Sequence, residues 1–254
     1  MTTPQEPRRV AFLGATQGMG RALARRLAAR GDRLFLLGRS TSDLERSAAD
    51  LEARSPGENA VAGFAVCDLE SVASFTPALD AAEAALGGLD AVIVTAGIFS
   101  TQEAMEADLT AAKRLLEVNF THTVIFCEHA RVRLLANGGG HLVVFSSVAG
   151  DRGRKPVAIY GAAKAGLSRY LEAMDHKWRR QGLLTLDVKP GFVKTGMTAG
   201  LKAPPFAGEP ERVAADVVAA MDRGAALLYT PAPWRGIMLV IRWLPRFLMR
   251  RLGF

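Results

Sequence analysis

The sequence is poor in cysteine and lacks the apolar segments that mark export or membrane insertion. Only Cys67 and Cys127 occur among the 254 residues, each in an apolar run and without CxxC spacing. Neither a disulfide framework nor a metal site is therefore expected. The first ten residues have no signal-peptide core, and nowhere do about 18 apolar residues follow one another without interruption. These absences predict a cytoplasmic protein without a membrane-spanning helix.

Acidic residues are outnumbered by basic ones, which gives a net charge of +7 and invites a nucleic-acid or membrane partner. Most of the excess positive charge lies at the end of the chain, because residues 231–254 contain five arginines and no acidic residue. The chain has no lysine-rich tract, zinc spacing or aromatic RNA-binding signature. We therefore predict no nucleic-acid partner and ask what the basic, apolar tail contacts instead.

A glycine-rich loop follows the first predicted strand, residues 9–13, and precedes an alanine-rich helix that ends at Gly31. Glycines let the backbone approach a pyrophosphate closely, and the free N–H groups of the helix favour the anion. The loop has the spacing GxxxGxG and predicts dinucleotide contacts from Gly14, Thr16, Gln17, Gly18, Met19 and Gly20.

The residues that end the next two predicted strands suggest which dinucleotide binds. Arg39 follows the strand at residues 33–37, where an arginine can pair with the 2′-phosphate of NADP. It favours NADP(H), with a solvated loop arginine as the alternative. Asp68 and Leu69 follow the strand at residues 60–66. Asp68 can accept from the adenine amino group or cap a helix that begins near Ser71.

Strands and helices alternate along the rest of the chain, which predicts an α/β fold. Further strands are expected at residues 90–95, 141–145, 183–189 and 226–230, and helices at 42–54, 71–86, 109–136 and 210–221. One more helix contains Tyr160 and runs to about residue 182. Such a chain forms a doubly wound parallel sheet (Rossmann fold) that binds ligands at the carboxyl ends of its strands. We expect one catalytic domain at 1–230 and a tail at 231–254.

The stretch at residues 146–164 carries the predicted chemistry. Tyr160 and Lys164 are four apart, so their side chains share one face of a helix. A buried ammonium beside a phenol lowers the tyrosine pKa from about 10 toward neutrality, where general acid/base catalysis is efficient. Ser147 follows an apolar strand, and its hydroxyl can bind a substrate carbonyl oxygen.

Asn119 lies in a polar interruption of the helix predicted at residues 109–136. Its amide competes with the backbone for hydrogen bonds. In the middle of a helix such a side chain either faces solvent or has a specific role. His122 and His129 have no partner at metal-ligand spacing and are expected to be ordinary helix residues.

Taken in order, these residues resemble the short-chain dehydrogenase/reductase family over nearly the whole chain. The motifs are GxxxGxG at 14–20, Ala96-Gly97, Asn119, Ser147, Tyr160-x-x-x-Lys164 and Pro190-Gly191-x-x-x-Thr195. The resemblance implies that Tyr160 is the general acid/base and that Ser147 polarises the carbonyl. It implies that Lys164 binds the nicotinamide ribose and lowers the tyrosine pKa, and that Asn119 holds a water in a proton relay. Cofactor contacts are also implied for Ala96, Gly97, Tyr160, Lys164, Pro190, Gly191, Val193 and Thr195.

The chain departs from the family pattern at two places, and the family also suggests how it assembles. Leu13 stands where a threonine is usual, and Val94-Thr95 replaces Asn-Asn before Ala96. Both positions support the loop and the central strand, so we expect altered hydrogen bonding and not lost activity. The resemblance further implies a homodimer or homotetramer.

The substrate is suggested by two segments near the end of the chain. The loop at residues 196–208 is long enough to form a lid. In the tail, Arg235, Arg242, Arg246 and Arg250 fall on one stripe of a helix that Pro245 kinks, with Trp243 and Phe247 on other faces. The tail is predicted to contact an anionic membrane surface peripherally, or else to pack on a neighbouring subunit or over the active site.

Short loops at Ser147 and Pro190, together with the tail, resemble the bacterial reductases that act on polyprenyl-phosphoryl 2-keto-pentose. This closer resemblance implies a lipid-linked ketone and a place on the inner face of the membrane. A soluble or acyl-chain ketone is the alternative substrate. A non-catalytic protein that keeps the nucleotide fold for membrane or partner binding is the alternative function.

Overall fold

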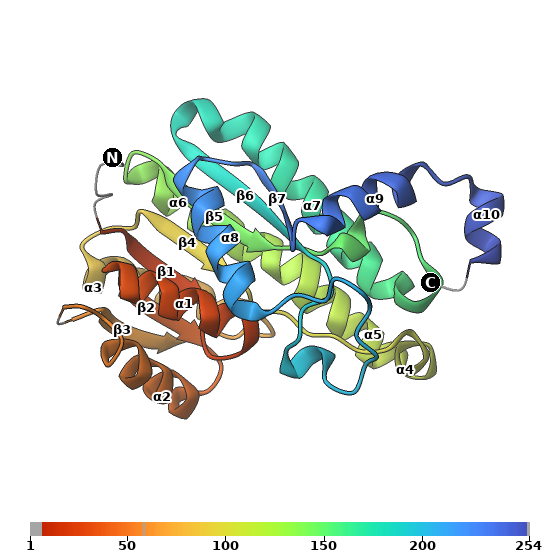
Figure 1. Cartoon of the computed structure of the whole chain (residues 1–254). Helices are drawn as coiled ribbons and strands as arrows, with labels where there is room; N and C mark the ends of the chain where they lie inside the picture. The colour runs from red at the N-terminus through yellow and green to blue at the C-terminus, as the bar shows by residue number, and fades with distance from the viewer. Residues whose placement is uncertain (1–6, 58, 253–254) are drawn as a thin grey trace.

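Seven parallel strands form one sheet at the centre of the molecule, in the order β3-β2-β1-β4-β5-β6-β7 (Figure 1). A computed structural model describes residues 7–57 and 59–252. Most of the segment expected to lack a signal-peptide core, residues 1–6, and the end of the tail, 253–254, lie outside the described residues. The strands are β1 (Arg9–Leu13), β2 (Arg33–Gly38), β3 (Val61–Val66), β4 (Ala91–Val94), β5 (Gly140–Phe145), β6 (Leu183–Pro190) and β7 (Leu227–Thr230). The predicted doubly wound fold is confirmed.

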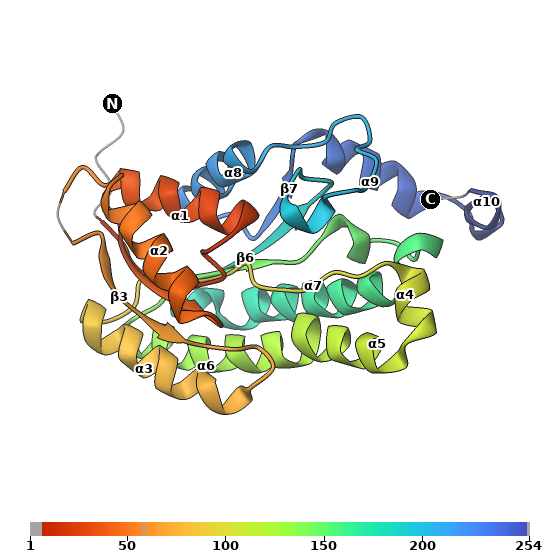
Figure 2. The ribbon, with the colours of Figure 1, turned by 90° about the horizontal axis from the view of Figure 1, so that it is seen from below.

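Helices cover both faces of the sheet (Figure 2). One face is covered by α1 (Gly18–Arg30), α2 (Thr41–Glu52) and α8 (Pro210–Asp222). The other is covered by α3 (Phe75–Leu86), α6 (Thr123–Ala136) and α7 (Ala158–Trp178). In β1, Val10 and Phe12 join the core beneath α1 and α8, whereas Ala11 and Leu13 join the core on the α3 and α6 side. A strand buried on both faces needs an uninterrupted apolar run, which explains the sequence of β1.

The predicted helix at residues 109–136 is interrupted by a wider turn. It consists of α5 (Leu109–Leu116), a π-helix at Glu117–His122 and α6. The hydroxyl of Thr123 donates to the Val118 carbonyl at 2.7 Å, which satisfies a backbone group within the widened turn. A short helix, α4 (Gln102–Ala107), precedes α5 and was not predicted. π-turns often occur at functional sites, and this one contains Asn119.

The tail forms two helices instead of one. These are α9 (Pro233–Trp243) and α10 (Arg246–Arg251). Leu244, with ψ at 130°, leaves the helical conformation because the ring of Pro245 disfavours it. The expected single stripe of arginines is therefore divided between α9 and α10. Among the described residues, no helix is both long enough and apolar enough to cross a bilayer.

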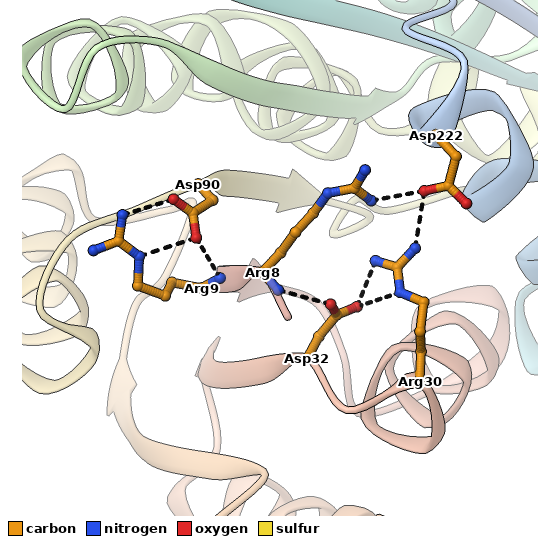
Figure 3. Close-up of polar contacts among 6 residues, drawn as sticks. All are labelled: Arg8, Arg9, Arg30, Asp32, Asp90 and Asp222. Atoms are coloured by element: carbon orange, nitrogen blue, oxygen red, sulfur yellow. Dashed lines mark hydrogen bonds and ion pairs between the residues drawn. The ribbon is translucent and has the colours of Figure 1, made fainter. Parts of the chain in front are cut away.

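Ion pairs join the sheet to the helices at the amino ends of the strands, opposite the glycine loop (Figure 3). Asp32, which is 1% exposed, accepts from the backbone N–H of Arg8 and from the guanidinium of Arg30, both at 2.9 Å. Asp90 accepts from Arg9 at 2.6 Å. Asp222 of α8 completes the cluster by binding both Arg8 and Arg30. The ion pairs at the amino ends of the strands stabilise the fold. The carboxyl ends of the strands are left for ligands.

Candidate active site

A cleft of about 260 Å³ opens at the carboxyl ends of β1 and β4, where the strand order reverses. Open α/β sheets bind their ligands at this switch point. The cleft is lined by most of the predicted dinucleotide residues, namely Gly14, Thr16, Gln17, Gly18, Met19, Gly20, Arg39, Asp68, Leu69, Ala96, Gly97 and Thr195. Met197 of the loop after β6 lines it as well.

The glycine loop is packed so closely that side chains cannot replace Gly14 or Gly20. A Cβ atom on Gly20 would lie 2.0 Å from the Gly14 carbonyl oxygen, and Gly14 itself has φ +98°. At the start of α1, Gln17 makes no side-chain capping hydrogen bond, so the first N–H groups of the helix have no side-chain acceptor there. A close backbone approach and helix N–H groups without a side-chain cap fit the pyrophosphate of a dinucleotide.

Thr95, at one of the two departures from the family pattern, makes a hydrogen bond of its own. Its hydroxyl donates to the Gly14 carbonyl at 2.9 Å and so fixes the glycine loop against the end of β4. Leu13, the other departure, is 1% exposed in the core. The expected change in hydrogen bonding is therefore found at Thr95.

Arg39 lies at the mouth of the cleft with its side chain 61% exposed. Its guanidinium is 3.6 Å from a carboxylate oxygen of Glu70, a longer contact than a hydrogen bond. Glu70 is held by Arg114, whose Nε donates to it at 2.7 Å, and this bond lowers the pKa of the Glu70 carboxyl. Because Arg114 already neutralises Glu70, Arg39 is available to an anionic ligand.

Asp68 and Leu69 form the wall of the cleft beyond β3. The Asp68 carboxylate accepts from the Glu70 N–H at 3.0 Å, so it caps its own turn and not the helix expected near Ser71. His122 was expected to be an ordinary helix residue, but its Nδ1 donates to the Leu69 carbonyl at 2.6 Å. The π-helix thereby fixes this wall, a role that spacing along the chain did not indicate.

Lys164 and Asn119 meet at Gly97, on the rim of the cleft. A Cβ atom on Gly97 would lie 2.9 Å from Asn119 Oδ1 and 3.8 Å from Lys164 Nζ. Lys164 is 5% exposed, and its ammonium donates to the Phe145 carbonyl at 2.9 Å. One turn earlier in α7, the ring centroid of Tyr160 is 5.9 Å from the same Nζ. The structure thus brings the predicted lysine, tyrosine and asparagine to the edge of this cleft.

Burial dominates the titration of this pair. It lowers the pKa of Lys164 to about 8, with the Asp187 carboxylate acting in the opposite direction. It raises the pKa of Tyr160 to about 12, opposed by a hydrogen bond with Ser147. The pKa of Tyr160 therefore shifts in the opposite direction to the lowering expected from Lys164. Burial destabilises the charged phenolate more than the hydrogen bond with Ser147 stabilises it. At neutral pH the phenol is protonated and can act as an acid.

Ser147 and Asn119 also have local structural partners. Ser147 Oγ accepts from the Ala149 N–H at 3.1 Å, so the Ser147 hydroxyl can still act as a donor. Asn119 is fully buried, and its amide accepts from the Ile98 N–H at 2.8 Å and donates to the Ile98 carbonyl at 2.6 Å. Its side chain therefore fixes the segment after β4, and the water that the resemblance implies at Asn119 stays a prediction.

Of the predicted residues at and after the end of β6, Thr195 lines the cleft, whereas Pro190, Gly191 and Val193 are not part of its lining. Val193 is 2% exposed and forms a parallel bridge with Gly208. Gly191, next to Pro190, is covered by α9, because a Cβ atom on it would lie 2.3 Å from the indole of Trp234. The Trp234 Nε1 donates to the Phe206 carbonyl at 3.2 Å. The tail and the loop expected to be a lid therefore meet beside the candidate active site.

Known proteins are similar to this chain in sequence and in fold. The model of the family described as short chain dehydrogenase matches residues 8–205. An uncharacterized oxidoreductase of Mycobacterium tuberculosis is 33% identical over 243 residues, covering 96% of each chain. A cis-4-hydroxycyclohexanecarboxylate dehydrogenase of Sinomonas cyclohexanicum is 32% identical and covers 75% of each chain. The structure of a levodione reductase, 25% identical, superposes with a TM-score of 0.78 over 87% of this chain and 95% of that one. This chain therefore belongs to the short-chain dehydrogenase/reductase family, the NAD(P)-dependent oxidoreductases that act on CH–OH and C=O groups.

Proposed function

We propose that this chain interconverts a ketone and a secondary alcohol with NADP(H), on a hydrophobic or lipid-linked substrate. Asn119, Ser147, Tyr160 and Lys164 are the proposed catalytic residues. The observation that carries the proposal is the meeting of Lys164 and Asn119 at Gly97, which itself lines the glycine cleft. The helix that contains Tyr160 and Lys164 therefore borders this cleft, which supports the proposal.

When bound, the nicotinamide nucleotide supplies or removes the hydride at the substrate carbon. The protein's residues then handle the oxygen and its proton. Tyr160, protonated at neutral pH, gives its proton to the oxygen during reduction and takes it back during oxidation. Ser147 donates its hydroxyl hydrogen to the same oxygen, which stabilises the charge that develops there.

The remaining residues hold this arrangement in place. Lys164 binds the ribose next to the nicotinamide and brings a positive charge toward the phenol, which favours proton release in the oxidative direction. Asn119 holds Ile98, and with it the wall that Gly97 contributes to the cleft. The apolar tail and the loop at 196–208 form the wall against which a hydrophobic substrate packs.

The preference for NADP(H) is supported by Arg39. A guanidinium 61% exposed at the mouth of the cleft, beside an already neutralised Glu70, suits the 2′-phosphate. Named relatives support the reaction class, since one is a dehydrogenase of a hydroxylated carboxylate and one neighbour is a reductase.

The test is calorimetric titration with NADPH and NADH side by side. Loss of one charged hydrogen bond costs about 1.5–3 kcal/mol, so Arg39→Ala should weaken NADPH binding roughly 10- to 100-fold and leave NADH unchanged. Arg33→Ala is the matched control, an exposed arginine at the opposite end of β2. Tyr160→Phe should keep nucleotide binding and lose turnover. Absence of binding by either nucleotide would remove the hydride source and favour the non-catalytic alternative.

The substrate and the place of action are proposed from the tail. Trp243 is 81% exposed and Phe247 58% exposed, amid arginines and without acids. Such a surface suits the inner face of an anionic membrane, where a lipid-linked ketone would be held. A soluble or acyl-chain ketone remains the alternative. The active unit is proposed to be a homodimer or homotetramer, as is common in the family.

A further inference from the structure

A second polar cluster is buried behind the candidate active site. The ammonium of Lys189, on β6, donates to Asp151 Oδ1 at 2.5 Å. The hydroxyl of Tyr229, on β7, donates to the other carboxylate oxygen, Asp151 Oδ2, at 2.7 Å. The side chain of Lys189 is 9% exposed and that of Asp151 is 3% exposed. Charged groups this deep are costly to bury, so they persist only when each is paired.

Asp187 connects this cluster to Lys164. Its Oδ2 lies 3.8 Å from Lys189 Nζ, and its Oδ1 accepts from the hydroxyl of Ser146, the residue before Ser147. On the sheet, Asp187 is paired with Val144 of β5, one residue before the Phe145 carbonyl that binds Lys164. The Asp187 carboxylate is also the group whose charge opposes the loss of the proton from Lys164.

We propose that Lys189 is a positioning residue of the active site, which pairs with the Asp187 carboxylate on the strand next to the one that binds Lys164, while Asp151 and Tyr229 hold Lys189 in place. This inference rests on the proposed catalytic role of Lys164. It adds to that role a second layer of residues, none of which touches the nucleotide cleft.

The charged groups around Asp187 and Lys164 support this sequence of electrostatic effects. Asp187 is faced by Lys189 and Ser146, by Ser168 of α7, and by the carboxylate of Asp151. Burial raises the pKa of the Asp187 carboxyl, and Lys189 acts to lower it. Without Lys189, the buried carboxylates of Asp187 and Asp151 would face each other with no ammonium between them, which favours protonation of Asp187. Lys164 would then lose the negative charge that opposes its burial, and its ammonium would deprotonate at lower pH.

Other charged groups near the cluster lie on its outer side. Arg154, in the loop before α7, and Lys189 both face Asp151. Arg242 of α9 faces Tyr229, so the tail helix closes the outer end of the cluster. On its inner side, Lys164 is faced by Asp187 and by the ring of Tyr160. The electrostatic effect on Lys164 therefore passes from Asp151 to Lys189 and from Lys189 to Asp187.

The test measures the titration of Lys164 directly, without substrate. Protein labelled with ¹³C at its seven lysines is titrated by NMR, and the Lys164 signal is assigned with Lys164→Arg. The wild-type midpoint is expected near 8. Lys189→Met should lower it by about one pH unit, the size of shift that one adjacent charge produces, and Lys189→Arg should restore it. Lys194→Met, on an exposed lysine paired with Glu209, is the matched control and should leave the midpoint unchanged.

An unchanged Lys164 midpoint in folded Lys189→Met would overturn the proposal. If that variant does not fold, Tyr229→Phe makes the same test, since it removes one hydrogen bond from Asp151 and leaves every charge in place. A smaller downward shift supports the positioning role, and no shift overturns it. Failure of the proposed function appears separately, as absence of NADPH binding in the wild type, and does not alter the Lys164 titration.

Discussion

The indole of Trp234 occupies the space that a side chain at Gly191 would need. Three of its ring atoms lie 2.3 Å from the position of a Cβ on that glycine. The two residues are 43 positions apart, and their contact brings α9 onto the end of β6. The same helix buries Met238 and Ile241 against Val148, the neighbour of Ser147. The first tail helix is therefore part of the wall of the candidate active site.

Gly191→Ala should destabilise the chain through this contact. The added methyl group must displace a rigid indole, and overpacking of this kind costs about 1–3 kcal/mol. Urea unfolding would measure the loss. The same substitution made in Trp234→Ala should cost much less, because the space is then empty. Gly196→Ala is the control, since nothing lies within 4 Å of its Cβ position. Equal costs of Gly191→Ala in both backgrounds would contradict the packing described.

Asn119→Asp should weaken nucleotide binding and stability together. The carboxylate can still accept from the Ile98 N–H but faces the Ile98 carbonyl, to which the amide now donates at 2.6 Å. A buried acceptor facing a carbonyl loses a bond and gains a repulsion, which costs about 2–4 kcal/mol. Calorimetry with NADPH and urea unfolding would measure both effects. Asn137→Asp, on an exposed asparagine near Glu83, is the control. Unaltered NADPH affinity in folded Asn119→Asp would show that Asn119 does not affect nucleotide binding in the cleft.

The sequence could predict β1, the glycine loop and α1 because their signals are local. A buried strand needs an apolar run, and a turn as tight as that at Gly14 needs glycine. Tyr160 and Lys164 were predictable for a related reason, since four residues along a helix place both side chains on one face. The strand order then brought their helix to the cleft, as expected for a doubly wound sheet.

Other features depend on contacts between distant residues, which spacing does not reveal. The π-helix widens where Asn119 reaches Ile98 across 21 positions and Thr123 binds Val118. His122 reaches Leu69 across 53 positions, and nothing in its own helix indicates that partner. The raised pKa of Tyr160 is likewise a consequence of tertiary burial, which outweighs the hydrogen bond with Ser147.

Asp32→Asn should destabilise the fold without affecting the active site. Asp32 is 1% exposed and binds the Arg8 backbone and the Arg30 guanidinium at the edge of the sheet opposite the cleft. Removing one partner of a buried ion pair costs about 3–5 kcal/mol. Urea unfolding should show this loss, and calorimetry should show unchanged NADPH affinity. Asp80→Asn removes an exposed pair with Arg133 and should cost less than about 1 kcal/mol. Similar losses in both variants would argue against the structural role of Asp32.

His141 should make the fold less stable in mild acid. Burial lowers its pKa to about 4 in the folded protein, whereas an exposed histidine titrates near 6.5. Between these values the unfolded chain takes up a proton that the folded chain refuses, so stability falls as pH drops below about 6.5. At pH 5 the loss should be about 2 kcal/mol.

Replacing this histidine tests its contribution. His141→Gln should reduce the loss of stability between pH 7.5 and pH 5 in urea unfolding by about 2 kcal/mol. His176→Gln, on the exposed side of α7, should not change the loss. An identical pH dependence in wild type and His141→Gln would place the acid sensitivity in other groups.

Sedimentation with vesicles can decide what the exposed side of the tail contacts. Wild-type protein should bind phosphatidylglycerol vesicles more tightly than phosphatidylcholine vesicles, because each arginine near an anionic surface contributes about 1 kcal/mol. Trp243→Ala with Phe247→Ala should weaken binding at least about tenfold, since both side chains are exposed on the tail and available to the interface. Leu109→Ala, 75% exposed at the start of α5, is the control.

The tail substitutions are preferable to truncation at Pro231. Truncation would also remove Met238 and Ile241, which pack on Val148, and would therefore disturb the active-site wall along with the surface. If the paired substitution lowers the sedimenting mass of the protein and not its vesicle binding, the tail packs on a neighbouring subunit. Tighter binding to a DNA fragment than to anionic vesicles would instead assign the arginines to nucleic acid. Only the loss of vesicle binding, with NADPH affinity retained, supports an enzyme that meets its substrate at a membrane.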